Sequence, residues 1–138
     1  MRPKIPFTVT ILIAIVLTFT AINAVRFIAA LDQWDVLTML EVSPNPLYIA
    51  LTGVFWAVTG LGLAFGLAAG HPMARWAGLV LVPLYACYYW FERLVLQNAV
   101  PRENTVFALV VTILVVFYTY LALLLPSATK FFIKRSYG

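Results

Sequence analysis

Apolar positions along the chain gather into four long runs, separated by short polar stretches. A helix needs about 20 mostly apolar residues to cross a bilayer, and the runs predict such helices at residues 5–28, 47–69, 73–96 and 104–125. The turn-forming sequences SPNP, GHP and NAVPREN separate the second, third and fourth runs from what precedes them. Because the connections are short, consecutive helices should be antiparallel neighbours. The pattern predicts an all-α, up-down four-helix bundle in the membrane.

The segment between the first two runs, residues 31–42, has a pattern of its own. Apolar side chains recur at every third residue, and polar side chains follow them one position later. These are Leu31, Trp34, Leu37 and Leu40, followed by Asp32, Asp35, Thr38 and Glu41. The pattern predicts a short amphipathic helix. It either lies on the outer membrane surface with Trp34 among the headgroups, or is a helical connector that caps the bundle.

Composition supports a membrane location. Of 138 residues, 64% are hydrophobic and 10% are charged, whereas a soluble domain is about 45–50% apolar and about 25% charged. The length suits a single domain. The first run could be a secretory signal, but its apolar stretch, residues 7–25, exceeds the usual core of about 7–15 residues and ends without a clear cleavage site. We therefore expect it to stay as an anchor.

Charge predicts the orientation. Basic residues close to short loops stay on the cytoplasmic side, and here they gather before the first run, at the GHP turn and after the fourth run. They are Arg2, Lys4, Arg75, Lys130, Lys134 and Arg135. We expect both termini in the cytoplasm and an inner or plasma membrane location. The net charge of +4 sits at the chain ends without the aromatic interleaving of a nucleic-acid groove, so no nucleic-acid partner is expected.

The basic tail, residues 126–138, alternates cations with apolar side chains in the sequence KFFIKRSYG. The apolar side chains Phe131, Phe132 and Ile133 are expected just inside the membrane, where the segment anchors on the membrane surface. Lys130, Lys134 and Arg135 would then bind anionic headgroups, each contributing about 1 kcal/mol. Docking onto a cytoplasmic partner is the alternative.

Small residues mark the expected helix contacts, because helices in lipid associate by close packing. Gly62, Gly66 and Gly70 recur at every fourth position of the second run. The fourth run carries a small-residue stripe made of Thr105, Ala108, Thr112, Thr119 and Ala122. The two sets could face each other within one protomer, or one of them could bind a second copy or a host complex.

An acid and a base stand side by side near the outer end of the third run, in YYWFERLVLQ. If that helix is centred near Ala86, Glu92 lies about 9 Å from the midplane and about 6 Å inside the outer boundary of the hydrocarbon. A bare carboxylate is costly at this depth. Asn23 and Arg26 share a face of the first helix at a similar depth, so we expect Arg26 to pair with Glu92 and Asn23 to act as a second donor.

Other side chains could complete a polar pocket around this pair. They are Thr52 and Trp56 of the second run and Tyr85, Tyr88 and Tyr89 of the third. Alternatively, the third helix leaves the membrane near Trp90, the aromatic residues form an interfacial belt, and Glu92 lies among the headgroups. An ion pair that only locks two helices together would look the same in sequence.

Familiar catalytic patterns are absent from the sequence, including the P-loop, GxSxG, HExxH and the Rossmann glycines. The single histidine, His71, is expected in a cytoplasmic turn, and the single cysteine, Cys87, in the core. We expect no cofactor and no bound metal. The favoured function is that of a non-catalytic subunit or assembly partner, in contact with lipids and with other membrane subunits or a second copy. The alternative is a small oligomeric carrier or ligand-binding protein that uses the Arg26, Glu92 and tyrosine pocket.

Overall fold

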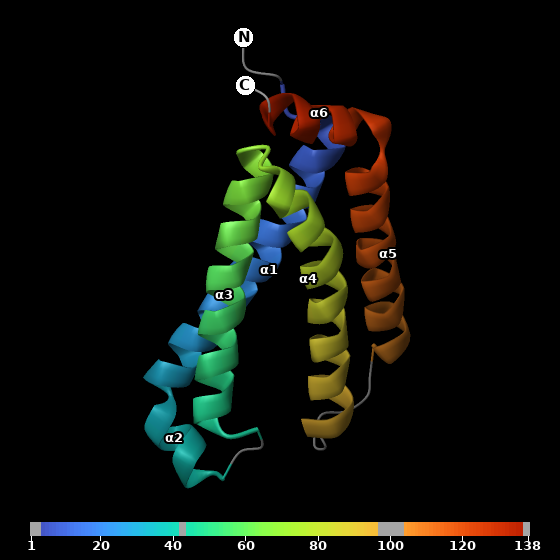
Figure 1. The fold of residues 1–138 in the computed structure, drawn as a ribbon. Helices are drawn as coiled ribbons and strands as arrows, with labels where there is room; N and C mark the ends of the chain where they lie inside the picture. Colours follow the sequence, from blue (N-terminus) through green and yellow to red (C-terminus); the bar gives the residue numbers. More distant parts are fainter. Residues whose placement is uncertain (1–3, 42–43, 97–103, 137–138) are drawn as a thin grey trace.

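The computed structural model describes residues 4–41, 44–96 and 104–136. Residues 134–136 are described by their backbone alone. These residues form helices and connections and contain no strand. The helices are α1 (Phe7–Asp32), α2 (Trp34–Met39), α3 (Pro46–Ala68), α4 (Pro72–Phe91), the π-helical η1 (Glu92–Leu96), α5 (Thr105–Leu124) and α6 (Pro126–Ser136). In Figure 1, α6 lies across one end of the molecule and α2 lies at the other end.

Four helices are long and apolar enough to cross a membrane: α1, α3, α4 with its η1 continuation, and α5. The most apolar stretch of each has a mean hydropathy between 1.4 and 2.5. Their bounds lie within four residues of the ranges expected from the sequence. The chain is therefore an all-helical, multi-pass membrane protein.

The helix starts follow from local sequence. Pro46 and Pro72 occupy the first positions of α3 and α4, where a backbone N–H would have no helical partner. Asn45 and His71 cap these helices, because each side chain accepts a hydrogen bond from the backbone N–H two residues later, at 2.9 and 3.3 Å. Gly70, with φ of 66°, lies in the tight turn between the two helices.

The amphipathic segment differs from the expected continuous helix. Leu31 and Asp32 belong to the last turn of α1, and α2 covers only Trp34–Met39. No residue of α2 is buried, and Trp34 is 37% exposed. This short helix therefore adds no side chain to the core.

The closest helix contact joins α1 and α3. A Cβ atom added at Gly53 would lie 3.0 Å from the backbone oxygen of Asn23 and 3.0 Å from the backbone nitrogen of Phe27. A Cβ atom at Gly60 would lie 2.1 Å from Oγ1 of Thr20. Glycine at these two positions, seven residues apart on one helix face, lets the two backbones approach each other.

The glycine set expected from the sequence plays a different part. A Cβ atom added at Gly62 would meet nothing within 4 Å, whereas one added at Gly66 would lie 2.8 Å from that of Ala74 in α4. Gly62 is two residues beyond Gly60, a rotation of about 200° around the helix. The contact with α1 therefore uses nearly the opposite face of α3 from the one that carries Gly62.

The small-residue stripe of α5 faces the protein interior. Thr119 and Ala122 are fully buried. The hydroxyl of Thr112 accepts a hydrogen bond from Nε1 of Trp90 in α4 at 3.2 Å. Thr105 and Ala108 are half-buried. Within the described residues, the stripe therefore contacts the protomer's own helices.

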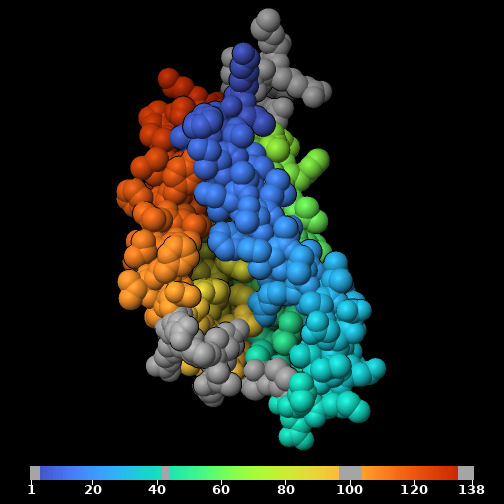
Figure 2. Space-filling view, turned by 180° about the vertical axis from the view of Figure 1, so that it is seen from behind, coloured from blue at the N-terminus to red at the C-terminus, as the bar shows by residue number. Residues whose placement is uncertain are grey.

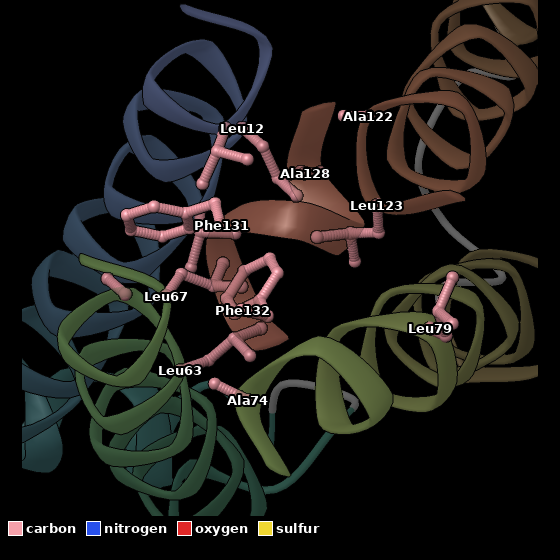
Figure 3. Close-up of a cluster of buried hydrophobic side chains, with 13 residues drawn as sticks. Leu12, Leu63, Leu67, Ala74, Leu79, Ala122, Leu123, Ala128, Phe131 and Phe132 are labelled. Atoms are coloured by element: carbon pink, nitrogen blue, oxygen red, sulfur yellow. The ribbon is translucent and has the colours of Figure 1, made fainter. Parts of the chain in front are cut away.

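The C-terminal helix α6 is part of the hydrophobic core rather than a free membrane anchor. Phe131 and Phe132 are 3% and 1% exposed. Figure 3 shows Phe131 and Phe132 beside side chains from α1, α3 and α4, with Leu123 of α5 nearby. Binding of anionic headgroups by the cations of this segment stays a prediction. Lys130 and Ile133 are exposed, whereas the side chains of Lys134 and Arg135 lie outside the described part.

Most of the remaining surface is apolar, as a lipid environment requires. Large side chains such as Phe65, Phe107 and Phe117 are 64–78% exposed. Cys87 is also exposed, so its expected place in the core is wrong. In lipid, a small apolar thiol can face outward without the cost it would have in water.

Candidate functional site

The ion pair expected from the sequence is present, and it joins α1 to the start of η1. Nη1 of Arg26 donates to Oε2 of Glu92 at 3.1 Å, and Nη2 of Arg26 donates to Oε1. Nη1 also donates to the hydroxyl of Tyr88 at 3.3 Å. Glu92 is only 3% exposed, whereas the Arg26 side chain is 27% exposed. The two parallel bonds make a bidentate pair, which fixes the relative position of the two helices.

Glu92 reaches this position at a change of helix type. α4 ends at Phe91, and Glu92 is the first residue of the π-helical turn that follows. A π-helical turn re-aims side chains relative to a continuous α-helix, and such turns are frequent at functional sites. The carboxylate of Glu92 is enclosed by protein.

A second polar link joins α1 to α4 about one turn away. Nδ2 of Asn23 donates to the backbone oxygen of Phe19 at 2.8 Å and to the hydroxyl of Tyr85 at 2.9 Å. The carbonyl of Phe19 can only accept, so it fixes which end of the amide faces it. Asn23 is 1% exposed, and its Oδ1 has no hydrogen-bond partner. A buried acceptor without a hydrogen bond lowers the stability of the fold, and a bound group that donates a hydrogen bond to it could remove this cost.

Aromatic rings fill the space between the two links. Trp56 of α3 lies 4.9 Å from the ring of Tyr85 in an edge-to-face arrangement, at 80° between the planes. Its ring is 5.4 Å from that of Tyr88, and the hydroxyl of Tyr88 also interacts with Thr52. These contacts connect α3 to the α1–α4 links and leave the polar groups little freedom to move.

A cavity of about 310 Å³ runs between the four long helices, next to this cluster. Its walls are mainly aliphatic and aromatic side chains. Seen from behind in Figure 2, the molecule is hollowed between α1 and α5, with α4 visible at the bottom of the hollow. Polar side chains on the wall are Thr20, Asn23, Thr59, Tyr85, Tyr89, Arg93, Asn104, Thr112 and Thr119.

Arg93 supplies a charged group to the cavity wall near the start of α5. Its Nη1 donates to the hydroxyl of Tyr89 at 3.0 Å, and its Nη2 lies 3.5 Å from Oγ1 of Thr105. Its guanidinium also lies 6.0 Å from the centre of the Trp90 ring. Arg93, Tyr89 and Asn104 together make one end of the cavity polar.

The structure brings most of the expected pocket residues into one cluster and separates one of them. The cluster contains Asn23, Arg26, Thr52, Trp56, Tyr85, Tyr88 and Glu92. Tyr89 turns instead toward Arg93. Arg26 and Glu92 do not line the cavity, whereas Asn23, Trp56, Tyr85 and Tyr89 do.

Sequence reasoning missed Arg93, Asn104 and the α5 threonines as cavity residues. One signal was present, since Tyr89 and Arg93 are four residues apart and therefore share a helix face.

The described residues contain no group of three histidine, cysteine, aspartate or glutamate side chains placed to hold a metal ion. Comparison of the chain with protein-family models, with curated proteins and with solved structures found no match.

Proposed function

We propose that this protein binds a small membrane-soluble molecule in the cavity between its four long helices. The observation that carries the proposal is the cavity itself, with a volume of about 310 Å³, apolar walls and a few polar groups. Ligand sites typically measure about 300–1,000 Å³ and combine apolar walls with a few orienting polar groups. A protein that serves only as a helical spacer has no need of such a space.

In this proposal the Arg26–Glu92 pair supports the site without touching the ligand. The two charges satisfy each other through two hydrogen bonds, and neither residue lines the cavity. The pair ties α1 to α4 on one side of the cavity, and the Asn23–Tyr85 bond lies on the cavity wall. The Arg26–Glu92 pair and the Asn23–Tyr85 bond thus keep two cavity walls in place.

We also propose the orientation that the charge pattern predicts. The four spans form an antiparallel up-down bundle in an inner or plasma membrane, and both termini lie in the cytoplasm. Lys4 and Lys130 are exposed near the end that carries α6, whereas Asp32, Asp35 and Glu41 are exposed near α2. This distribution supports the α6 end as the cytoplasmic one.

A subunit or assembly partner of a larger membrane complex is the second candidate, and one observation favours it. Gly62 lies on an exposed face of α3 with no neighbour within 4 Å. Glycine on a lipid-facing surface allows the backbone of another helix to approach closely. A second copy of this chain would satisfy the same face.

Mass determination of the protein released intact from its native membrane distinguishes the candidates. Ligand binding predicts an added mass below that of a protein, on one or more copies of this chain. Stable association with other protein chains, without any such small mass, would support the subunit function and contradict the proposed ligand binding.

A pair of adjacent valines provides matched variants for the same measurement. Val111 lines the cavity, whereas Val110 is 48% exposed on the outer face of α5. Val111→Phe should fill part of the cavity and remove the added mass, and Val110→Phe should retain it. Retention of the ligand by both variants would show that the cavity is not its site.

A further inference from the structure

The two arginines near the cavity already have partners within the protein. Arg26 is held by Glu92 through both terminal nitrogens. Arg93 donates to the hydroxyl of Tyr89 and has further interactions within the protein. Neither cation therefore requires a charged ligand. A charged ligand would also lose its hydration on entering an apolar cavity, at a high cost in free energy.

Most threonine hydroxyls on the cavity wall are engaged as well. Those of Thr20, Thr112 and Thr119 each donate to a carbonyl oxygen of their own helix, at 2.7–2.8 Å. Such a bond uses the only proton of the hydroxyl. These three residues can therefore offer a ligand no more than a lone pair on oxygen.

Asn23 and Tyr85 differ from the threonines, because each has a hydrogen-bonding group that the protein does not use. Nδ2 of Asn23 donates to the carbonyl of Phe19 and to the hydroxyl of Tyr85, whereas Oδ1 has no partner. The hydroxyl of Tyr85 accepts this bond and, within the described residues, donates to no acceptor. The pair thus has one unused acceptor and one unused donor on neighbouring side chains of the wall.

One acceptor and one donor together match a hydroxyl group. A hydroxyl both donates and accepts, so it can bond Oδ1 of Asn23 and the phenolic O–H of Tyr85, whereas an ether or a ketone can bond only the second. Asn23 lies nine residues before the end of α1, about 14 Å along the helix. Lipid chains at this depth offer a hydroxyl no hydrogen bond, and an unbonded hydroxyl in an apolar environment is costly. The pair would remove that cost.

Aromatic rings next to the pair suit an apolar molecule. Phe19 and Trp56 line the cavity, and their ring centres lie 5.5 and 4.9 Å from that of Tyr85. The rest of the wall is mainly aliphatic. A few orienting polar groups within apolar walls are typical of sites for small molecules. A molecule that matches this wall has one hydroxyl among the rings and an apolar remainder.

We propose that the ligand is a neutral lipid alcohol, whose hydroxyl donates to Oδ1 of Asn23 and accepts from the hydroxyl of Tyr85. This inference rests on the proposed function and names its ligand class. Oδ1 is covered by its neighbours in the structure, so the amide or an adjacent ring shifts when the ligand binds. A long-chain alcohol and a fused-ring sterol share this chemistry.

Tryptophan fluorescence can test the proposal, because Trp56 lines the cavity and is only 9% exposed. Bromine quenches tryptophan at short range. The protein would carry Trp56 as its sole tryptophan, after substitution by phenylalanine of Trp34, Trp76 and Trp90, and would be placed in lipid nanodiscs. The first probe is a long-chain alcohol brominated in mid-chain. The matched probe is its methyl ether, which accepts a hydrogen bond but cannot donate one.

We expect saturable quenching by the alcohol, with a half-saturating mole fraction in the bilayer about tenfold lower than that of the ether. Asn23→Leu has a similar shape without the acceptor, so it should lose this difference while it still binds the ether. Tyr85→Phe keeps the ring and should weaken the binding of both probes, because both accept from its hydroxyl. The brominated carboxylate of the same chain should bind more weakly than the alcohol.

Two controls locate the binding and identify the source of the hydroxyl. Val111→Phe should abolish saturable quenching by both probes, because Val111 lines the cavity. Val110→Phe, on the outer face of α5, should not. Displacement of the brominated alcohol by unbrominated cholesterol, compared with displacement by unbrominated octadecanol, then distinguishes a sterol from a long-chain alcohol.

The results separate failure of this inference from failure of the proposed function. Equal affinity for alcohol and ether, or a difference that persists in Asn23→Leu, would overturn the hydroxyl assignment and leave ligand binding intact. Undiminished binding by Tyr85→Phe would overturn the role of Tyr85, and tighter binding of the carboxylate would overturn the neutral class. Absence of saturable quenching by every probe, with no small mass on the protein from its native membrane, would remove the proposed function as well.

Discussion

The Arg26–Glu92 pair predicts an unequal response to the loss of either partner. Arg26→Leu leaves the Glu92 carboxylate, which is 3% exposed, without its counter-charge. Removing one partner of a buried pair costs about 3–5 kcal/mol of unfolding free energy. Glu92→Leu leaves Arg26, whose side chain is 27% exposed and long enough to carry its charge toward water. We expect that variant to lose only about 1–2 kcal/mol.

A double-mutant cycle measures the interaction itself. The double variant Arg26→Leu with Glu92→Leu leaves no unpaired charge at the site, so it should be more stable than Arg26→Leu alone. The expected coupling energy is about 2–3 kcal/mol. Reversible unfolding in mixed micelles, driven by increasing fractions of a denaturing detergent, gives the free energies for the cycle. Lys130→Leu removes an exposed cation and should change stability by less than about 0.5 kcal/mol.

Two results would refute this reasoning. Equal losses for the two single variants would mean that the difference in exposure between Arg26 and Glu92 has no energetic effect. Losses that simply add in the double variant would mean that the two residues do not interact in the folded protein. The second result would remove the structural role that we assign to the pair.

Two further predictions concern helix packing. Gly53→Ala should destabilise the protein, because the new Cβ would lie 3.0 Å from backbone atoms of α1 that cannot move aside. Gly62→Ala, whose new Cβ would meet nothing within 4 Å, should be neutral or slightly stabilising in the same unfolding assay. Equal effects of the two substitutions would contradict the observed contact face. Phe132→Ala should lower the free energy of unfolding by about 3–5 kcal/mol, because this side chain is 1% exposed. It should also speed tryptic cleavage at Lys130. Unchanged cleavage would indicate that α6 is not held by its core contacts.

The pocket could be predicted in part because polar groups inside the membrane have few ways to be satisfied. The depths of Arg26 and Glu92, read from their positions in the apolar runs, were enough to predict the pair that the structure contains. The same argument grouped Asn23 with the tyrosines of the third span, and Asn23 bonds Tyr85. The cavity could not be predicted this way, because empty space depends on how four helices diverge and not on any single residue.

The four spans were determined by the sequence itself. Lipid offers no partners for backbone N–H and C=O groups, so an apolar run of this length has to form a helix that satisfies its own hydrogen bonds. Length and hydropathy therefore predicted α1, α3, α4 and α5 without any knowledge of how they pack.

Only the tertiary structure decided which apolar faces meet one another. Lipid chains are as apolar as leucine, so the sequence does not distinguish a side chain that faces lipid from one in the protein core. The sequence therefore did not reveal that α1 packs against Gly53 and Gly60 and not against Gly62. Nor did it reveal that Phe131 and Phe132 lie in the core. The crossing of the helices sets these contacts, because in lipid close fit and paired polar groups hold helices together more than hydrophobicity does.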